Sequence, residues 1–382
     1  MYVDCRAAFP NLDVVKDRLV LCASALVMKT KRIMRGRHTK RTMGFVKACL
    51  AYCHVTIPSI DDPFSRLHLF QLLGHVALAN QCLPQCDTFF KEAIKLVQDL
   101  PEHLETGPAG SGAAGGRRAS VGGGGGKRAT RSEPRLVDFL LGFAGSLVVV
   151  PGQPGDAGGP FYLVKGLLNA LERFPWEQGA GGKARVHIAL LPLLCAYAQR
   201  ALPYRVEGVD ANDVLYGGNQ RYVAELEQYF ATLVEGILNQ LTELAAEETG
   251  GPNGLVRQGT LVTELLNQLL ACARVAATDA DAGGEDADDR ANEAAGARKV
   301  VHKLFMLARK RTAGAAPPKR GEDAKERRAT TRFYENTVRH LLELSKTAAR
   351  ARSNGRAAQA PGYQALAVAI APPPPGPPPA RK

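Results

Sequence analysis

Two pairs of cysteines stand four positions apart in this chain, a spacing that can place two metal ligands on one face of a helix. Cys49 and Cys53 are followed by His54, and Cys82 and Cys86 form the second pair. Tetrahedral zinc takes four Cys or His ligands. Structural zinc sites usually hold their cysteines on a tight turn, whereas these pairs lie in apolar runs with helical spacing, and Cys is a common small core residue. We therefore expect buried thiols rather than a metal site, and no cofactor.

A glycine run, Gly122–Gly126 followed by Lys127, has the general character of a phosphate-binding loop. The full motif requires Gly at position 121 and Ser or Thr at position 128, where this chain has Val121 and Arg128, and no strand precedes the run. We interpret it as a flexible insert. None of the eight histidines stands in a visible Ser, Cys and Asp neighbourhood, although a triad assembled from distant segments stays open. The sequence therefore predicts no enzyme.

The segment 210–218 is the most distinctive loop of the chain. A calcium loop starting at its first residue would need an oxygen ligand, Gly and Glu where the sequence has Val214, Leu215 and Arg221. One interpretation is that its Asp and Asn side chains satisfy turn amides, while its two glycines permit positive φ before a helix. The other is a partner-binding site. Its candidate residues are Asp210, Asn212, Asp213, Leu215, Tyr216, Gly217 and Gly218.

Seven cations gather across an expected helix end and the turn that follows it. They are Lys29, Lys31, Arg32, Arg35, Arg37, Lys40 and Arg41. Cations near a helix carboxyl end are favoured by its dipole, and a solvated surface is the simplest explanation. The functional interpretation is an anionic surface, either an acidic protein or phospholipid headgroups. No aromatic platform or recognised nucleic-acid module accompanies the cluster.

The elements that must position these residues are amphipathic helices. Val223, Leu226, Phe230, Leu233 and Ile237 step by three and four, which lines one face of a helix. Apolar residues repeat with the same spacing in other segments, which Pro, Gly or charged residues separate. These segments are expected to be helices, and no convincing strand pair is visible. The expected helices are 12–35, 42–57, 63–80, 84–98, 134–150, 160–174, 184–201, 219–248, 260–277, 298–310 and 330–350. Pro192 predicts a kink or break within its helix.

Composition agrees with a helical chain that has a sizeable core. The 382 residues are 45% hydrophobic but only 6% aromatic, so the core must be mostly Leu, Val and Ala. The net charge of +12 suggests an anionic partner. Part of the charge lies in segments that look unfolded. No secretory signal is visible, so reduced thiols and a cytoplasmic location are expected. The most apolar run, 139–150, is too short for the roughly 20 residues of a membrane span.

These patterns predict an all-α fold, an irregular HEAT-like α-solenoid of stacked helix pairs with disordered inserts and a disordered tail; a compact helical bundle is the structural alternative. The expected sections are a first solenoid section 1–105, a Gly-rich disordered insert 106–132, a second solenoid section 133–277, an acidic linker 278–297, last helices 298–351 with a charged linker 312–328, and a Pro-rich disordered tail 352–382.

Several blocks, in order, resemble one family. They are Tyr2–Phe9, Phe45–Cys53, Val76–Leu83, Asp87–Ile94 and Val209–Gly218. Together they resemble the carboxyl-terminal part of the scaffold subunit of the retriever complex, the vacuolar protein sorting-associated protein 35-like family. The resemblance covers about 2–98 well and about 134–250 in patches, and it fades beyond.

The resemblance implies an α-solenoid without enzymatic activity. It implies that the solenoid holds a small subunit of metallophosphoesterase-like fold, and it admits the coiled-coil CCC proteins of the Commander assembly as partners. In the family the amino-terminal part binds an arrestin-like subunit, so that subunit is not expected on this segment. The implied role is recycling of integral membrane cargo from endosomes to the plasma membrane, on an endosome-associated protein that reaches the membrane indirectly.

Two features depart from the family, the Gly-rich insert and the Pro-rich tail. Met1 also falls where the family is already deep in its solenoid. A basic helical-repeat protein that binds nucleic acid is the alternative function. It predicts binding that weakens steeply with salt and is lost on charge reversal at Arg32, Arg35 and Arg37. On the resemblance, no nucleic acid is expected.

Overall fold

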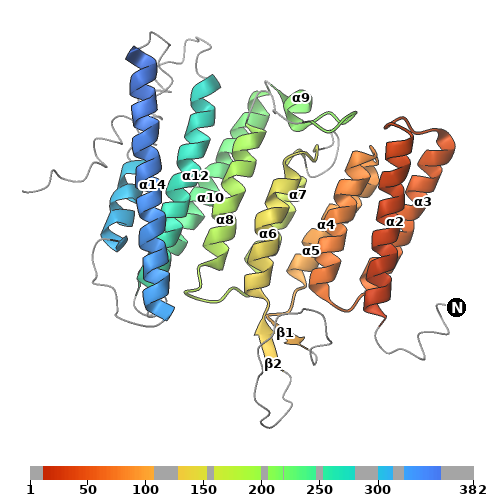
Figure 1. Ribbon diagram of the computed structural model, residues 1–382, viewed down its shortest axis with the longest axis horizontal. Coiled ribbons are helices and arrows are strands. Elements are labelled where there is room, and N and C mark those ends of the chain that lie inside the picture. The colour runs from red at the N-terminus through yellow and green to blue at the C-terminus, as the bar shows by residue number, and fades with distance from the viewer. Residues whose placement is uncertain are drawn as a thin grey trace, which may run out of the picture. The chain divides into compact units, whose positions relative to one another are not determined.

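The computed structural model describes residues 12–106, 128–152, 159–198, 205–217, 219–246, 253–279, 300–312 and 322–353. The chain divides into two compact units. The first comprises Met1–Glu177 with Ala196–Glu225, and the second Gln178–Cys195 with Leu226–Lys382. The two are described separately below, and the elements are labelled in Figure 1.

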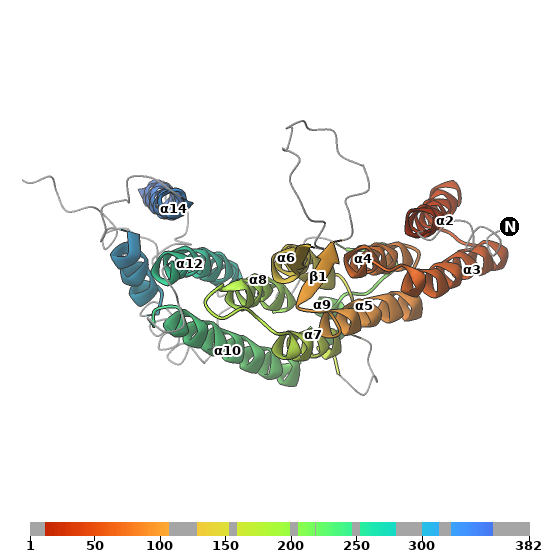
Figure 2. The ribbon, with the colours of Figure 1, turned by 90° about the horizontal axis from the view of Figure 1, so that it is seen from below.

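The first unit is a stack of helix pairs in two layers. Its helices are α2 (Asp13–Ile33), α3 (Lys40–Thr56), α4 (Pro63–Ala79), α5 (Leu83–Gln98), α6 (Glu133–Leu147), α7 (Tyr162–Arg173) and the short α9 (Asn212–Tyr216), with a 3-10 turn η1 (Ile57–Ser59) after α3. Figure 2 shows α4 and α6 in one layer and α5 and α7 in the other. Contacts of α4 with α6 and of α5 with α7 hold each layer together, and α4 with α5 joins the layers. Pairs that bury their faces against neighbouring pairs are the organisation of an α-solenoid.

Local sequence signals set where these helices begin. Thr39 and Thr42 form a reciprocal capping box at the start of α3. Asp62 caps α4 by accepting hydrogen bonds from the amides of Phe64 and Ser65, and Pro63 occupies the first turn, where its missing N–H costs nothing. The Asp62-Pro63 signal explains why the start of α4 could be anticipated from the sequence, whereas α3 begins two residues before the expected position.

Phenylalanines and a close helix contact build the core of the first unit. The Phe90 ring lies tilted against the Phe143 ring with 5.7 Å between their centroids, and the Phe143 ring is stacked on Phe139 at 5.3 Å. A Cβ atom placed on Gly74 would come within 2.7 Å of the Phe90 ring. Gly74 of α4 is therefore the residue that lets α5 approach so closely.

A two-stranded antiparallel sheet also belongs to the first unit. Strands β1 (His103–Thr106) and β2 (Arg128–Arg131) pair with His103 opposite Arg131 and Thr106 opposite Arg128. The expectation of no strand pair was therefore wrong. The expected insert 106–132 also loses both of its ends to ordered structure, because residue 106 and residues 128–131 lie in strands.

The second unit holds most of α8 (Gly182–Tyr197) and of α10 (Gln220–Glu243), together with α12 (Gly254–Asp279), a helix over 300–312 and α14 (Glu322–Ser353). A buried cluster joins the last three of these helices, and its members are Leu266, Leu270, Val301, Phe305 and Leu341. Hydroxyl and amide bonds fix the register of α12 on α14, from Asn267 to Thr337 at 3.0 Å and between Thr260 and Thr330 at 2.7 Å.

The all-α prediction is confirmed, and each expected helix corresponds to a helix of the structure. Three local expectations change. Helix α8 runs through Pro192, so the break, one of the two outcomes expected there, does not occur. The expected charged linker 312–328 is helical from Glu322 onward, because α14 starts there. A short helix, α9, occupies the segment expected as a loop.

Residues 278 and 279 of the expected acidic linker lie in α12, and residues 352 and 353 of the expected tail lie in α14. The remaining disorder predictions, for most of the Gly-rich insert, for 280–297 and for the tail from 354, lie outside the described residues. Among the helices that are described, none combines the length and the apolar character that crossing a bilayer requires.

Candidate functional site

The α9 segment, defined here as residues 205–217, is fixed to the core of the first unit through Gly152. The side-chain oxygen of Asn212 accepts a hydrogen bond from the Gly152 amide at 2.8 Å, and the Tyr216 hydroxyl donates to the Gly152 carbonyl oxygen at 2.7 Å. Asn212 is 1% exposed. These two candidate residues therefore hold the segment in place, because the Asn212 side-chain oxygen and the Tyr216 hydroxyl are both bonded to the Gly152 backbone.

An aromatic stack supports the same segment. The Tyr216 ring lies 5.2 Å from the Tyr222 ring in a parallel stack, and Tyr222 stacks on Phe161 at 4.8 Å. The hydroxyl of the neighbouring Tyr197 donates to the Leu147 carbonyl oxygen at 2.7 Å. Burial raises the pKa of both Tyr197 and Tyr222 well above the ordinary tyrosine range. Both phenols therefore stay protonated donors, which suits a structural role.

Asp213 and Gly217 shape the α9 turn. The Asp213 carboxylate is buried, and the exposed Arg205 guanidinium lies 3.5 Å from it. Gly217 has φ −52°, so the expected positive φ is wrong at this position. Glycine is needed there for a different reason, because a Cβ would lie 2.3 Å from the Asp213 carbonyl oxygen. Gly218, the last candidate residue, lies outside the described residues.

The part of the α9 segment that faces solvent carries charged residues ahead of α9, among them Arg205 and Glu207, and an apolar residue on α9 itself. Asp210 is exposed, Val214 is 50% exposed, and Leu215 is half-buried. An apolar side chain held outward on a rigid, hydrogen-bonded element is suited to contact another protein. The six candidate residues that the structure describes thus divide into a supporting group and a solvent-facing group.

The basic turn, defined as Lys29, Lys31, Arg32, Arg35, Arg37, Lys40 and Arg41, spans the end of α2 and the start of α3. All but Lys31 are exposed. The Lys31 ammonium donates to the Ala79 carbonyl oxygen, which ties the end of α2 to the end of α4. Within the described ranges, no member of the basic turn forms an ion pair with a carboxylate. The turn itself is a left-handed bend, with φ +49° at Arg35 and +76° at Gly36.

The structure brings the basic turn and the α9 segment together. The Gln81 amide, in the turn between α4 and α5, donates to the Glu207 carbonyl oxygen at 3.1 Å. A Cβ on Gly36 would lie 3.4 Å from the Glu207 carboxylate. Two surfaces that are about 170 residues apart in sequence thus share one edge of the first unit, where helix ends and turns gather. Sequence reasoning missed Gln81 and Glu207, because neither belongs to a motif.

The cysteine pairs are packing residues in this structure. Cys53, Cys82 and Cys86 are buried, and Cys49 is partly so. Burial raises the pKa of Cys53 and of Cys86 to about 12, which keeps both as neutral thiols. In the described part of the chain, no three side chains of His, Cys, Asp or Glu are grouped as a metal site would require. The arrangement matches the expectation of buried thiols at three of the four positions.

Comparison with known proteins places these features in a family. The model of the VPS35L C-terminal domain matches residues 1–282. A zebrafish (Danio rerio) protein named VPS35 endosomal protein-sorting factor-like is 39% identical over 70% of this chain and 25% of its own length. The human protein of that name is 37% identical over 71% of this chain and 25% of its own length. A Dictyostelium discoideum relative is 36% identical over 70% of the chain and 25% of its own length.

This chain therefore spans about a quarter of the length of the curated relatives it matches. Among solved structures, a circular tandem repeat protein aligns over 94% of this chain and 76% of its own, with a TM-score of 0.42 and 10% identity. That similarity is too low to support an argument about function.

Proposed function

The chain belongs to the family of the VPS35L C-terminal domain, and on that basis we propose that it acts as a non-enzymatic scaffold segment in endosomal protein sorting. The relatives are named as endosomal protein-sorting factors. The observation that best supports a scaffold is the helix-pair stack of the first unit, to which the Asn212 and Tyr216 side chains fix the α9 segment through the Gly152 backbone. A scaffold needs a rigid surface, and this one is fixed by Asn212, Tyr216 and Gln81.

We further propose that the first unit binds the small metallophosphoesterase-fold subunit of a retriever-like complex, with Val214 at the contact. A partner that covers Val214 and Leu215 would bury apolar surface, worth about 25 cal/mol per Å² removed from water. Asp210 beside them would give a polar rim contact that sets orientation. The exposed basic turn on the same edge offers positive charge to an acidic rim of the partner.

If the chain is part of a retriever-like complex, the proposal also gives it a cellular role. The protein would act in the Commander assembly with CCC coiled-coil proteins, recycle integral membrane cargo to the plasma membrane, and associate with endosomes indirectly through its partners. The arrestin-like subunit is expected to bind elsewhere in the longer relatives, and not on this segment. No nucleic acid enters this role.

Binding of the purified chain to the purified small subunit tests the proposal. Isothermal titration calorimetry should show micromolar or tighter binding, and Val214→Asp should weaken it at least about tenfold, because a charge would be buried at the contact. The matched control is Val55→Asp on α3, where the side chain is 77% exposed, and it should leave affinity unchanged. A folded chain that shows no binding at micromolar concentration would overturn the proposal. Equal losses for the two variants would remove Val214 from the contact.

A further inference from the structure

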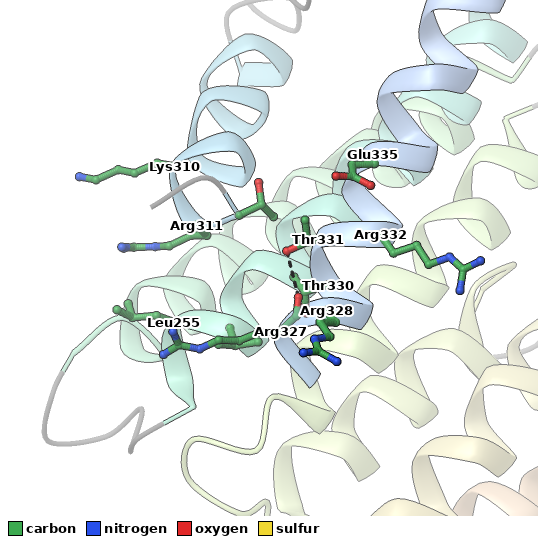
Figure 3. Close-up of a pocket in the computed structure, with 11 residues that line it drawn as sticks. Leu255, Lys310, Arg311, Arg327, Arg328, Thr330, Thr331, Arg332 and Glu335 are labelled. Atoms are coloured by element: carbon green, nitrogen blue, oxygen red, sulfur yellow. Dashed lines mark hydrogen bonds between the residues drawn. The ribbon is translucent and has the colours of Figure 1, made fainter. Parts of the chain in front are cut away.

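A pocket of about 710 Å³ opens in the second unit, between the first turn of α12, the end of the 300–312 helix and the first turns of α14. Figure 3 shows it with its lining side chains. The size falls within the range of about 300–1,000 Å³ that is usual for small-molecule sites. The site is separate from the α9 segment and the basic turn, both of which belong to the first unit.

The charged lining of this pocket is predominantly cationic. Its charged members are Lys310, Arg311, Arg327, Arg328, Arg332 and Glu335. Five cations against one carboxylate give a local net charge of +4, and Glu335 is itself exposed to solvent. Among the described residues, none of the five cations forms an ion pair. A pocket with this excess of positive charge raises the local concentration of anions.

The Arg311 guanidinium is held in position by a buried amide. Its Nε donates to the Gln258 side-chain oxygen at 2.6 Å, and the Gln258 amide nitrogen in turn donates to the Leu241 carbonyl oxygen at 2.7 Å. Gln258 is 3% exposed. Because only Nε is engaged in this bond, the two terminal nitrogens of the guanidinium remain as a fork for a bidentate acceptor. An arginine fixed by a buried partner loses little side-chain entropy on binding.

Arg327 supplies a second cation that lacks an internal acceptor. Its Nε is buried and has no hydrogen-bond partner. A buried donor without an acceptor destabilises the folded state, so a ligand oxygen that accepts from this Nε would relieve that cost. In Figure 3 the Arg327, Arg311 and Lys310 side chains extend to the same side of the pocket, whereas Arg332 extends to the opposite side of α14.

The wall that carries Arg327 is rigid. The Thr330 hydroxyl is buried, shares a hydrogen bond of 2.7 Å with the Thr260 hydroxyl of α12, and bonds to the Glu326 carbonyl oxygen at 3.1 Å. This bond fixes the first turns of α14 against α12. The backbone that carries Arg327 is therefore held in place before a ligand arrives, which favours binding.

We propose that this pocket is a binding site for a ligand that carries several phosphate groups, of the inositol polyphosphate class. Planar guanidinium groups match phosphate oxygens in a bidentate geometry. A single phosphate, with a charge of about −1.5 to −2, would leave about half of the +4 charge uncompensated, whereas several phosphates on a compact ring can reach Lys310, Arg311 and Arg327 together. All five cations lie beyond residues 1–282, the part that the family model matches. The site is therefore independent of the proposed partner contact.

Calorimetric titration of the full chain with inositol hexakisphosphate is the first test. The expected result is saturable binding at one site, weakened at least about tenfold by Arg311→Gln and by Arg327→Gln, since each loses a charged hydrogen-bond donor. The matched control is Arg339→Gln, an exposed position on the same helix outside the pocket, which should change affinity less than about twofold by the same reasoning. Thermal melts of all variants show that each is folded.

A second experiment distinguishes a membrane lipid headgroup from a soluble inositol phosphate as the ligand. Flotation with vesicles containing phosphatidylinositol bisphosphate, against phosphatidylserine vesicles of equal surface charge, shows whether the headgroup is bound as a lipid. Recruitment that needs the phosphoinositide and is lost in Arg327→Gln assigns a lipid source, and binding of the free inositol phosphate without recruitment assigns a soluble one. Absence of binding in both arms overturns the site, as does an Arg339→Gln effect equal to those of the pocket variants.

Discussion

The side-chain amide of Gln81 donates a hydrogen bond to the Glu207 carbonyl oxygen at 3.1 Å, which fastens the start of the α9 segment to the turn between α4 and α5. The backbone is left-handed on both sides of this bond, with φ +60° at Gln81 and +72° at Gly208. A Cβ on Gly208 would fall 2.1 Å from the Gln81 amide nitrogen. The two turns therefore interlock, and the surface that we propose for partner binding depends on that interlock.

Gly208→Ala should loosen the α9 segment. An alanine at this position must keep the left-handed backbone conformation of Gly208, which costs about 1–2 kcal/mol. Its methyl group also displaces the Gln81 side-chain amide from the Glu207 carbonyl oxygen. Hydrogen exchange measured by mass spectrometry should show faster exchange over residues 209–217. Gly44→Ala is the control, because Gly44 is helical with open space around its Cβ position and Ala there should stabilise by about 0.5–1 kcal/mol. Unchanged exchange in the Gly208 variant would contradict the interlock.

Gly152→Ala should destabilise the first unit more strongly. A Cβ there would lie 2.4 Å from the Pro160 carbonyl oxygen, a backbone atom that cannot move as a side chain can. Shifting the backbone also strains the hydrogen bonds from Gly152 to Asn212 and Tyr216. We expect a loss of about 1–3 kcal/mol in the free energy of unfolding, measured by urea titration. Gly142→Ala on α6, where the Cβ position is open, should show no loss.

Stability should fall at alkaline pH because of the buried thiols. Burial raises the folded-state pKa of Cys53 and of Cys86 from 9.0 to about 12. Between these values the unfolded chain has released protons that the folded chain still binds, so the free energy of unfolding decreases as pH rises from about 9 toward 12. Each thiol contributes up to about 1.4 kcal/mol per pH unit in that window. Urea titrations at pH 8 and pH 10 measure the effect.

The variant Cys53→Ala isolates that contribution. It should lower stability at pH 8 but reduce the further loss on going to pH 10, because one of the thiols with a strongly raised pKa is gone. An unchanged difference between the two pH values would mean that other groups, such as the buried Tyr197 and Tyr222, account for the alkaline loss.

Charge reversal in the basic turn tests whether it contacts an anionic surface. The triple variant Arg32→Glu, Arg35→Glu and Arg37→Glu should reduce binding to phosphatidylserine vesicles at least about tenfold, since each basic residue near such a surface contributes about 1 kcal/mol. A control with the same total charge reverses three scattered exposed cations, as Arg18→Glu, Lys95→Glu and Arg221→Glu. Equal losses would show that net charge, and not the turn, governs binding.

The same triple variant decides the nucleic-acid alternative. Tight binding of a single-stranded oligonucleotide, falling steeply with salt and lost in the Arg32, Arg35 and Arg37 variant, would favour a nucleic-acid-binding protein. We expect weak binding that the scattered-charge control reduces to the same extent.

The long helices could be predicted because their apolar residues repeat with the helical period and because Thr39 and Asp62 are typical caps. The helix α9 could not, because five residues are too few to show a period. Strands β1 and β2 escaped prediction because each is four residues long and the glycine run lies between them. Their pairing joins segments about 20 residues apart, a distance at which no short turn motif indicates a hairpin.

The candidate sites were predicted with mixed success for similar physical reasons. Composition identified the basic turn, since its cations are close in sequence. It did not show that Asn212 and Tyr216 bond to Gly152, because those contacts span about 60 residues and belong to no motif. The pocket around Arg311 and Arg327 could not be predicted either, because its residues come together only through contacts between helices. Its charged segment suggested an unfolded linker, whereas a buried Thr330 and the register of α14 on α12 organise it.

The ladder between β1 and β2 has a practical use. Because Thr106 faces Arg128 across paired strands, the backbone leaves and re-enters the first unit at neighbouring points. A fluorescent reporter or an affinity handle whose own ends are close together can therefore be grafted between those two positions with little penalty for loop length. Live imaging of the protein needs no fusion at either terminus.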